Sequence, residues 1–387
     1  MERAGKKVKK VLSNYDFSLI LLVLFLCIFG LIMIYSTSYY NADHYYNEEN
    51  LYFKRQLQFI GAGLVIMILV SMFDYHLLVK NFFKKINLAW VLYIVSLLLQ
   101  IFIIFAGYSS NGSSRWVNLG ISNFQPSEFT KVVAVISGAF IVSSRKKRLD
   151  SFLGFITTFV WMIPHIGLIA LQNLSSAIIV AGIFVSMCFV VSKKKLYYGI
   201  VVILAVAAVV GFIALKGYRA GRISQWLNVE EQSGSQILQG LYAIASGGLF
   251  GKGLGNGIMK KGQISEVHTD MIFSIICEEL GIIGGIMLIA LFLILLWKIF
   301  KIARNAPDIY GGLMATGVLV HIAVQSWIHV AVVTSLIPPT GAVLPFVSYG
   351  GSSLIMMMAE MGLVLSVSKY TYTEKEESEE DENEKQI

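Results

Sequence analysis

The sequence predicts an all-α polytopic membrane protein with about ten transmembrane helices, and three observations lead to this fold class. Of its 387 residues, 56% are hydrophobic and only 14% are charged, which is far more apolar surface than one soluble core can hide. Apolar runs of roughly 17 to 25 residues, the length that crosses a bilayer, recur along the chain. The Lys and Arg residues gather in short clusters between these runs, a pattern that sets membrane orientation. The net charge of +7 therefore indicates a membrane protein and no nucleic-acid partner.

The first helix is expected directly after a basic arm. Residues 3–10 hold five Lys and Arg residues, and the apolar run at 17–35 is too long for the core of a cleaved signal peptide. Further long spans are expected at 57–73, 86–105, 152–171, 198–215, 271–297 and 310–333, and shorter or interrupted ones at 128–142, 176–191 and 351–367. The three cysteines all fall within apolar runs, so they indicate neither a disulfide framework nor a metal cluster.

The distribution of positive charge predicts the orientation of these helices. With a cytoplasmic N-terminus, the predicted inner side carries eighteen Lys and Arg residues and the predicted outer loops carry nine, as the positive-inside rule requires. The longest outer loop, 216–269, then connects helices 7 and 8. We expect residues 1–369 to form a single membrane domain and the acidic segment 370–387 to be a disordered cytoplasmic tail.

The outer segment before the fourth helix, 112–131, carries charged and aromatic residues that a simple connection does not need. Arg115 and Trp116 lie side by side in the sequence, and Glu128 and Lys131 follow at a spacing of three at the helix entrance. This spacing allows an ion pair across one helical turn, and in that interpretation the two residues only stabilise the fold. Alternatively, Lys131 is a cation reserved for a phosphate group. Arg115, on the same side of the membrane, favours the second interpretation.

Within the long outer loop, residues 236–257 begin with helical apolar spacing and end in six glycines. The glycines do not form a nucleotide-binding loop, because no strand precedes them and no Gly-Lys-Ser/Thr ending follows. An interfacial helix followed by a tight turn fits the pattern better. The loop is basic, and Lys252 is one of the residues that can attract either a diphosphate or anionic lipid head groups.

The stretch 266–281 places a carboxylate, Asp270, where this polar loop turns into a long apolar span. His268 and Thr269 precede it, and helical spacing puts Ser274 and Glu278 on the same face as Asp270. Acidic residues at the entrance of an apolar span are functional candidates. The alternative is that Asp270 only caps the N-terminus of the helix.

The third unusual outer segment, 337–353, contains three of the six prolines of the chain. A helix cannot run through it, and irregular backbone at membrane depth is tolerated only where protein or a water-filled cavity surrounds it. We therefore expect this segment to line a cavity.

These segments resemble the SEDS family of shape, elongation, division and sporulation proteins, of the FtsW/RodA/SpoVE type. The resemblance rests on five blocks in the same order: SSRWVNLG at 113–120, QPSEFTK at 125–131, SGGLFGKGLGNG at 246–257, EVHTDMIFSIICEELG at 266–281 and PPTGAVLPFVSYGGSS at 338–353. It is closer to the FtsW/SpoVE branch. Three places depart from the family pattern: Asn173 lies where an Asp is common, Ile264 begins the usual Leu-Pro-Glu element, and His329 replaces an Asn.

The resemblance implies a glycosyltransferase that polymerises lipid II into glycan strands at the outer face of the bacterial cytoplasmic membrane. It implies that Asp270 is the catalytic carboxylate, and that the outer cavity binds substrate through Arg115, Trp116, Glu128, Lys131, Lys252, His268 and Thr269. It also implies a class B penicillin-binding protein as the transpeptidase partner, together with other division or elongation proteins. No tightly bound cofactor is expected, and Mg²⁺ or Mn²⁺ would accompany the lipid diphosphate.

Two other classes of function fit the same composition. A flippase or transporter for the lipid-linked precursor would also need many helices, and Glu360 inside the last span would then serve as a relay rather than as a buried hydrogen-bonded acid. A non-enzymatic division scaffold would use the outer loops for contacts and would need no acid at one fixed place.

Overall fold

The computed structural model describes a predominantly helical molecule. It covers residues 15–46, 48–83, 86–106, 108–110, 113–118, 123–201, 203, 207, 211, 226–227, 236–260, 264 and 267–384. The principal helices are α2 (Phe17–Tyr46), α3 (Leu51–Met72), α4 (Leu88–Ala106), α5 (Pro126–Ser144), α6 (Phe152–Phe159), α7 (Ile163–Gln172), α8 (Leu174–Val191), α11 (Gln236–Gly247), α12 (Ile272–Arg304), α13 (Ile309–Val333) and α14 (Gly351–Glu384). Short 3₁₀ helices are η1 (Tyr75–Leu78) and η2 (Lys146–Arg148).

Eight of the described helices are long and apolar enough to cross a membrane, and the bent pair α6 and α7 makes a ninth. The chain is therefore a multi-pass membrane protein. The span expected at 198–215 and most of the loop after it lie outside the described residues, so the count of ten and the place of the long loop between helices 7 and 8 stay predictions.

The predicted single span at 152–171 is broken into two helices. The helices α6 and α7 are bent by 45° at the break between them. Pro164 lies in the first turn of α7 and has no N–H to donate to the carbonyl of residue 160, so a straight helix loses a hydrogen bond there. The chain breaks again before α8, where the Asn173 side chain accepts hydrogen bonds from the backbone N–H groups of Ser175 and Ser176.

Short strands occur in the connections, which an all-α prediction does not include. The hairpin of β1 (Asn81–Phe83) and β2 (Ile86–Asn87) precedes α4. A second antiparallel sheet has the order β3 (Tyr108–Ser110), β4 (Ser113–Asn118), β5 (Asn123–Phe124) and precedes α5. The Ser352 hydroxyl donates to the Asn123 carbonyl, so this sheet lies against the start of α14.

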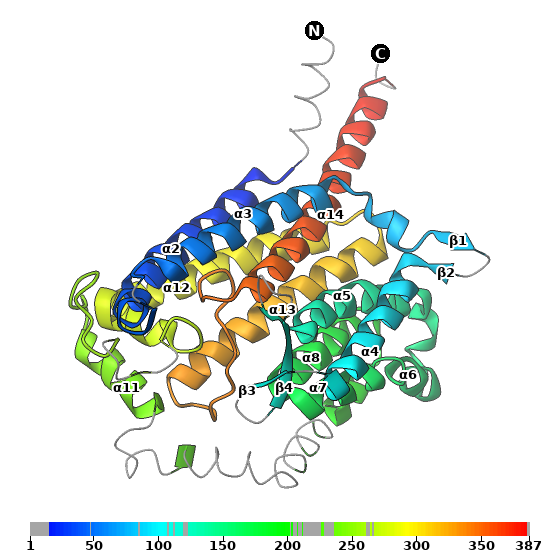
Figure 1. Ribbon diagram of the computed structural model, residues 1–387. Helices are drawn as coiled ribbons and strands as arrows, with labels where there is room; N and C mark the ends of the chain where they lie inside the picture. Colours follow the sequence, from blue (N-terminus) through cyan, green and yellow to red (C-terminus); the bar gives the residue numbers. More distant parts are fainter. Residues whose placement is uncertain are drawn as a thin grey trace.

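The helices pack closely where glycine removes the side chain between them. In Figure 1, α3 and α14 run side by side. A Cβ added at Gly351 would lie 2.6 Å from the Phe59 ring, and one at Gly362 would lie 2.7 Å from the Met67 carbonyl. The helix α5 is enclosed by α4, α8, α13 and α14. Its side chains are almost all buried, so polar groups on α5 must find partners inside the bundle.

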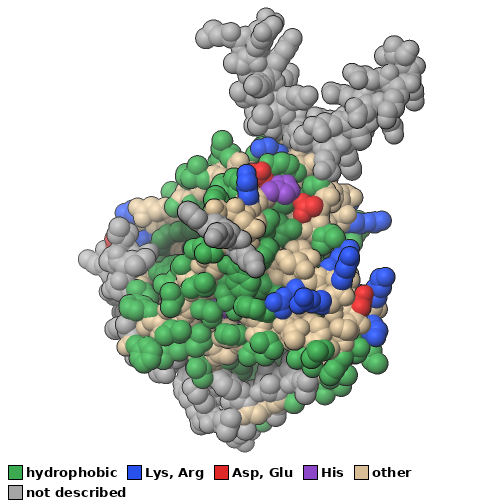
Figure 2. All heavy atoms as spheres, turned by 90° about the vertical axis from the view of Figure 1, so that its right-hand side faces the viewer, with side chains coloured by type: hydrophobic (Ala, Val, Ile, Leu, Met, Phe, Trp, Pro, Cys, Tyr) green, Lys and Arg blue, Asp and Glu red, His purple; other side chains and the backbone are tan. Residues whose placement is uncertain are grey.

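The two ends of the bundle differ in character. One end joins the end of α3 to the start of α13, since His76 contacts Asp308 at 3.3 Å and Tyr75 donates to the same carboxylate. It also carries the basic connection at η2. Figure 2 shows the flank that includes this region, with hydrophobic side chains over most of the surface and the Lys and Arg side chains gathered on one side. The opposite end holds Asp270 and the irregular segment 334–350.

The helix α14 extends further than the sequence predicts. Composition indicates a disordered tail from residue 370, whereas the backbone is helical to Glu384 and projects away from the bundle (Figure 1). Glu and Lys have high intrinsic helix propensity, so a run rich in both can continue a helix that begins inside the bundle. The domain boundary at 369 stays a prediction.

Candidate functional site

Asp270 lies in the turn that leads into α12. The N-cap residue of this helix is Met271, whose side chain makes no capping hydrogen bond. Asp270 thus lies one residue before the N-cap position that the capping interpretation assigns to it. The Asp270 carboxylate is half-buried and accepts a hydrogen bond of 3.1 Å from the Gln236 side chain at the start of α11. The helix α11, which the sequence predicts to be interfacial, is thus joined to Asp270 by this hydrogen bond.

A tight turn of the irregular segment lies beside this carboxylate. Gly341 has φ +70°, a conformation that favours glycine, and a Cβ added there would lie 3.9 Å from Asp270 Oδ2. At the other end of the segment, the Tyr349 N–H donates to the His268 carbonyl at 2.8 Å. The irregular backbone predicted for 337–353 is confirmed up to residue 350, after which α14 begins, and it packs against the loop that carries Asp270.

His268 lies in an aromatic cluster just before Asp270. Its ring centroid lies 4.3 Å from that of Tyr52 and 5.4 Å from that of Tyr349. Burial lowers the pKa of His268 to about 4, because the charged imidazolium loses its water. The imidazole is therefore neutral at pH 7. Thr269, between the two, is half-buried.

Glu128 and Lys131 are brought together as their spacing predicts. Their side chains form an ion pair of 2.8 Å in the first turns of α5, with 7% and 2% of each side chain exposed. The Lys131 ammonium also donates to Gln325 Oε1 on α13 at 2.8 Å. Two acceptors inside the protein therefore orient this cation, and the Glu128 Oε2 atom is buried with no hydrogen-bond partner among the described residues.

Arg115 and Trp116 lie on β4, the middle strand of the small sheet before α5. Trp116 is half-buried and pairs with Tyr108 on β3. The side chain of Arg115 lies outside what the structure describes, so its expected role stays a prediction. The sheet holds the backbone of both residues at the same end of the bundle as the start of α5.

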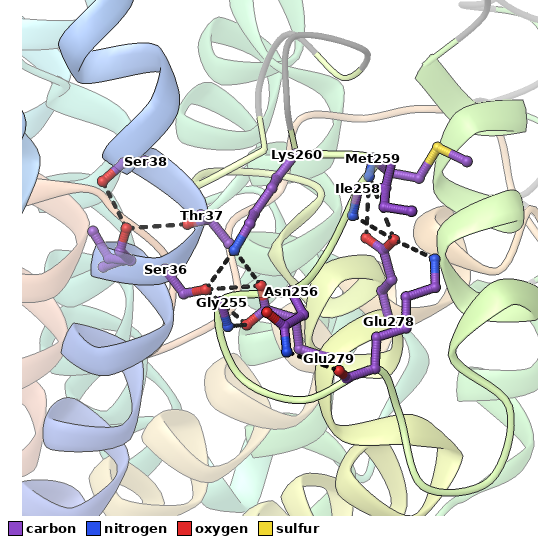
Figure 3. A network of polar contacts seen from close by, with 12 residues as sticks. Ser36, Thr37, Ser38, Gly255, Asn256, Ile258, Met259, Lys260, Glu278 and Glu279 are labelled. Carbon is purple, nitrogen blue, oxygen red and sulfur yellow. Dashed lines mark hydrogen bonds and ion pairs between the residues drawn. The ribbon is translucent and has the colours of Figure 1, made fainter.

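A polar network around Glu278 and Glu279 holds the glycine-rich turn onto α12 (Figure 3), and Lys252 belongs to this network. Its ammonium pairs with Glu278 at 2.8 Å, and the same carboxylate accepts from the Ile258 N–H at 2.8 Å. Glu279 pairs with Lys260 at 2.5 Å and accepts from Ser36 on α2. Both carboxylates are fully buried. Lys252 is thus a partner of Glu278, and its expected contact with substrate stays a prediction.

The same turn also fills a break in α12. Gly281 has φ +74° inside the helix, so the carbonyls before it lack their usual helical partners. The N–H of Lys252 donates to the Glu278 carbonyl at 3.0 Å, and that of Gly253 donates to the Glu279 carbonyl at 2.9 Å. A loop distant in sequence therefore completes the first turns of the helix that follows Asp270.

Several partners of the predicted site residues are not singled out by the sequence. Gln236 and Gln325 are uncharged and belong to no recognised motif. The one signal for Gln325 is its place inside an apolar span with His321 and His329 four residues to either side, since polar side chains at that spacing share one helix face.

The described residues contain no group of three or more His, Cys, Asp or Glu side chains that could hold a metal ion. Mg²⁺ prefers one or two carboxylates together with substrate phosphates and waters. A divalent cation at Asp270 would therefore take most of its ligands from a bound diphosphate.

Comparison with known proteins places these features in a family. The model of the FtsW/RodA/SpoVE cell cycle proteins matches residues 17–373. The chain is 37% identical to stage V sporulation protein E of Bacillus subtilis (strain 168) over 364 residues, covering 93% of this chain and 98% of the relative. It is 36% identical to the probable peptidoglycan glycosyltransferase FtsW of the same organism over 378 residues, covering 94% and 93%.

Solved structures with this architecture also match nearly the whole chain. One comes from a study titled "Structural coordination of polymerization and crosslinking by a peptidoglycan synthase complex" and has a TM-score of 0.75. The rod shape determining protein RodA of Thermus thermophilus has a TM-score of 0.68. Each is 27% identical, with 92% of this chain and 98% of that chain covered.

Proposed function

Because the chain belongs to the FtsW/RodA/SpoVE family of cell cycle proteins, we propose that it is a peptidoglycan glycosyltransferase of the SEDS type. It polymerises lipid II at the outer face of the cytoplasmic membrane during division or sporulation, as the names of its relatives indicate. The termini are cytoplasmic in this proposal, because the end of the bundle that carries the basic residues 145–148 faces the cytoplasm.

The observation that carries the proposal is the position of Asp270. Its carboxylate lies at the loop-to-helix junction, one residue before the N-cap position, and accepts a hydrogen bond from Gln236 beside the Gly341 turn. We assign it as the general base that accepts the proton of the 4-hydroxyl of the acceptor sugar. The oxygen of that hydroxyl then forms a bond to the anomeric carbon of the donor. The bond from this carbon to the lipid diphosphate breaks, and its electron pair leaves with the diphosphate in one inverting displacement.

The cations of the site would stabilise the leaving diphosphate. Lys131, oriented by Glu128 and Gln325, is one candidate, and Arg115 on the neighbouring strand is the other. Fixed positive charges in a site that excludes water stabilise developing negative charge strongly. A bound Mg²⁺ or Mn²⁺ would add positive charge at the same place. Trp116, Lys252, His268 and Thr269 remain proposed substrate contacts.

We also propose a class B penicillin-binding protein as partner. The matched structure whose title describes a peptidoglycan synthase complex supports this assignment. A glycan strand needs crosslinking after it is made, so a transpeptidase at the outer face would act on the product. Other division or elongation proteins would complete the assembly.

Purified protein in liposomes that contain lipid II tests the function. Formation of glycan polymer supports the glycosyltransferase. Movement of lipid II between leaflets without polymer would instead support the flippase, and neither result, with or without the transpeptidase, would support the scaffold.

A further inference from the structure

A chain of buried polar side chains crosses the interior of the bundle from the proposed cation Lys131 to Glu360. Gln325 stands at its centre, and its Oε1 atom lies 2.8 Å from Lys131 Nζ and 3.0 Å from His321 Nε2. The other imidazole nitrogen, His321 Nδ1, lies 2.6 Å from Glu360 Oε2. The chain joins α5, α13 and α14, and the side chains of His321 and Glu360 are 1% and 0% exposed.

The contacts of Gln325 determine which way its amide points. Its Nε2 group lies 3.1 Å from the Val343 carbonyl, and a carbonyl only accepts hydrogen bonds. The amide nitrogen must therefore face Val343, and the amide oxygen faces Lys131 and His321. Because that oxygen also only accepts, His321 Nε2 must carry a proton and donate it.

This assignment leaves one proton between His321 and Glu360. With Nε2 protonated, the contact at Nδ1 is a hydrogen bond only if a second proton lies between Nδ1 and Glu360 Oε2. That proton is bonded to Nδ1 or to the carboxyl oxygen, and either arrangement keeps Nε2 as the donor to Gln325. Gln325 therefore requires the proton on Nε2, and Glu360 holds the imidazole ring through Nδ1 in the orientation that points Nε2 at the Gln325 oxygen.

The same glutamine also holds the backbone beside Asp270. Val343 follows the turn at Gly341, whose added Cβ would lie 3.9 Å from Asp270 Oδ2. One turn along α13, His329 Nδ1 donates to the Ala342 carbonyl at 2.8 Å. Two adjacent carbonyls of the segment are thus anchored to α13, and one of the two anchors is the amide that contacts Lys131.

We propose that His321 and Glu360 are positioning residues that fix the Gln325 amide and, through it, both the Lys131 ammonium and the segment beside Asp270. The inference rests on the proposed function, because it assigns Lys131 to the diphosphate of lipid II. If Glu360 were lost, the contact at Nδ1 that holds the His321 ring would be lost with it. The ring could then turn, Nε2 would no longer donate to the Gln325 oxygen, and the amide would be free to turn away from Lys131.

Two substitutions of Glu360 by side chains of similar length distinguish a positioning role, which needs a hydrogen bond to His321, from a role in packing alone. In Glu360→Gln the new amide N–H donates to Nδ1, so the His321 ring keeps its orientation and Lys131 keeps its partner. In Glu360→Met no hydrogen bond to Nδ1 remains. We expect lipid II binding, measured in an Asp270→Asn background without turnover, to fall about tenfold or more in the Met variant and by less than about threefold in the Gln variant, since tenfold is roughly the contribution of one hydrogen bond from a charged group such as Lys131 to the diphosphate.

A double-mutant cycle tests whether the effect passes through Lys131. Lys131→Met alone should weaken lipid II binding, and adding Glu360→Met should weaken it much less than Glu360→Met does when Lys131 is present. Ser366→Ala, which removes a partly buried hydrogen bond from α14 to the Phe73 carbonyl, is the matched control and should leave binding unchanged. Thermal unfolding in detergent shows which variants are folded.

Three results would overturn the inference while leaving the proposed function intact: equal binding by the Gln and Met variants, additive losses in the cycle, or a loss of about tenfold or more in Glu360→Gln itself. The last result decides the question even if the Met variant does not fold, because the Gln variant is the milder change. Failure of the wild-type protein to polymerise lipid II would instead overturn the proposed function.

Discussion

Asp270 is the residue at which the assigned chemistry can be tested most directly. An acid just before a helix can serve the helix or a substrate, and here Met271, rather than Asp270, occupies the N-cap position of α12. In Asp270→Asn the shape and the hydrogen bond from Gln236 can persist after the Asn amide rotates, but an amide cannot accept the proton of a hydroxyl. We expect polymerisation by the purified variant to fall about 10²- to 10⁴-fold, the usual effect of removing a general base, with the melting temperature little changed.

The outcome that contradicts this assignment is a well-folded Asn variant that retains more than about a tenth of the wild-type rate, a threshold set well inside the expected range. A normal lipid II affinity alongside the lost rate would place the defect in the chemical step. If the protein were only a scaffold, the wild type itself would not polymerise lipid II.

His268 gives the stability of the protein a pH dependence. Its native pKa is about 4 against about 6.5 in an unfolded chain, so between these values only the unfolded state binds the proton. The free energy of unfolding therefore falls as the pH falls from about 6.5 to about 4, by about 2 kcal/mol at pH 5. His268→Phe keeps an aromatic ring between Tyr52 and Tyr349 but cannot be protonated. Its melting temperature should drop less than that of the wild type between pH 7.5 and pH 5, and an equal drop in both proteins would refute the argument.

At the residue scale the sequence singles out charged positions and does not reveal their partners. Asp270, Glu128 and Lys131 are recognisable because charges are costly in apolar spans. Gln236, Gln325 and Gly341 come from three other segments and meet these residues only in the folded chain. No local pattern records such contacts, so the capping and pairing alternatives cannot be decided from the sequence.

At the scale of elements, the glycine-rich turn and the break in α12 depend on each other. A Cβ added at Gly251 would lie 2.2 Å from the Glu279 carbonyl, whereas one at Gly255 would meet nothing within 4 Å. Both glycines have positive φ, +79° and +83°. Alanine should therefore cost about 1 to 2 kcal/mol at either position through backbone strain, and about 1 to 3 kcal/mol more at Gly251 because the loop must move off α12. Thermal unfolding of the two variants measures the difference.

Gly255→Ala is the matched control, because it changes the same residue type in the same turn without a collision. If both variants unfold at the same temperature, the close contact between the turn and α12 does not explain why residue 251 is a glycine. If Gly251→Ala loses stability and also polymerisation, the turn helps to hold the helix that follows Asp270.

The elements themselves were predicted well where periodicity and length decide, and poorly where one residue interrupts a pattern. The spans α3, α5 and α13 follow from apolar runs bounded by polar loops. The break at Pro164 was not predicted, although proline is its physical cause. The break at Gly281 is even harder to predict, since a glycine in an apolar span is equally consistent with close helix packing. The break there is stable because Lys252 and Gly253 satisfy the freed carbonyls, a contact between distant segments.

At the scale of the whole molecule, the positive charges divide the bundle into two ends. The connection after α8 is tied to the connection after α5, because the Lys193 N–H donates to Asp150 Oδ1 at 2.8 Å. Each of these connections carries at least three consecutive basic residues. The irregular segment near Asp270, 334–350, has no Lys or Arg. This asymmetry supports the proposed orientation, in which Asp270 lies at the outer membrane–water interface.

Single-cysteine labelling tests this orientation in intact cells. The three native cysteines are free and buried, so a background without them is the starting point. Asn256 and Lys194 are both exposed and lie at opposite ends of the bundle in the proposed orientation. A cysteine at Asn256 should react with a membrane-impermeant thiol reagent added outside, and one at Lys194 should react only after the membrane is permeabilised. Reaction of the Lys194 position alone in intact cells would invert the molecule. Asp270 would then face the cytoplasm, and polymerisation at the outer face would lose its proposed base.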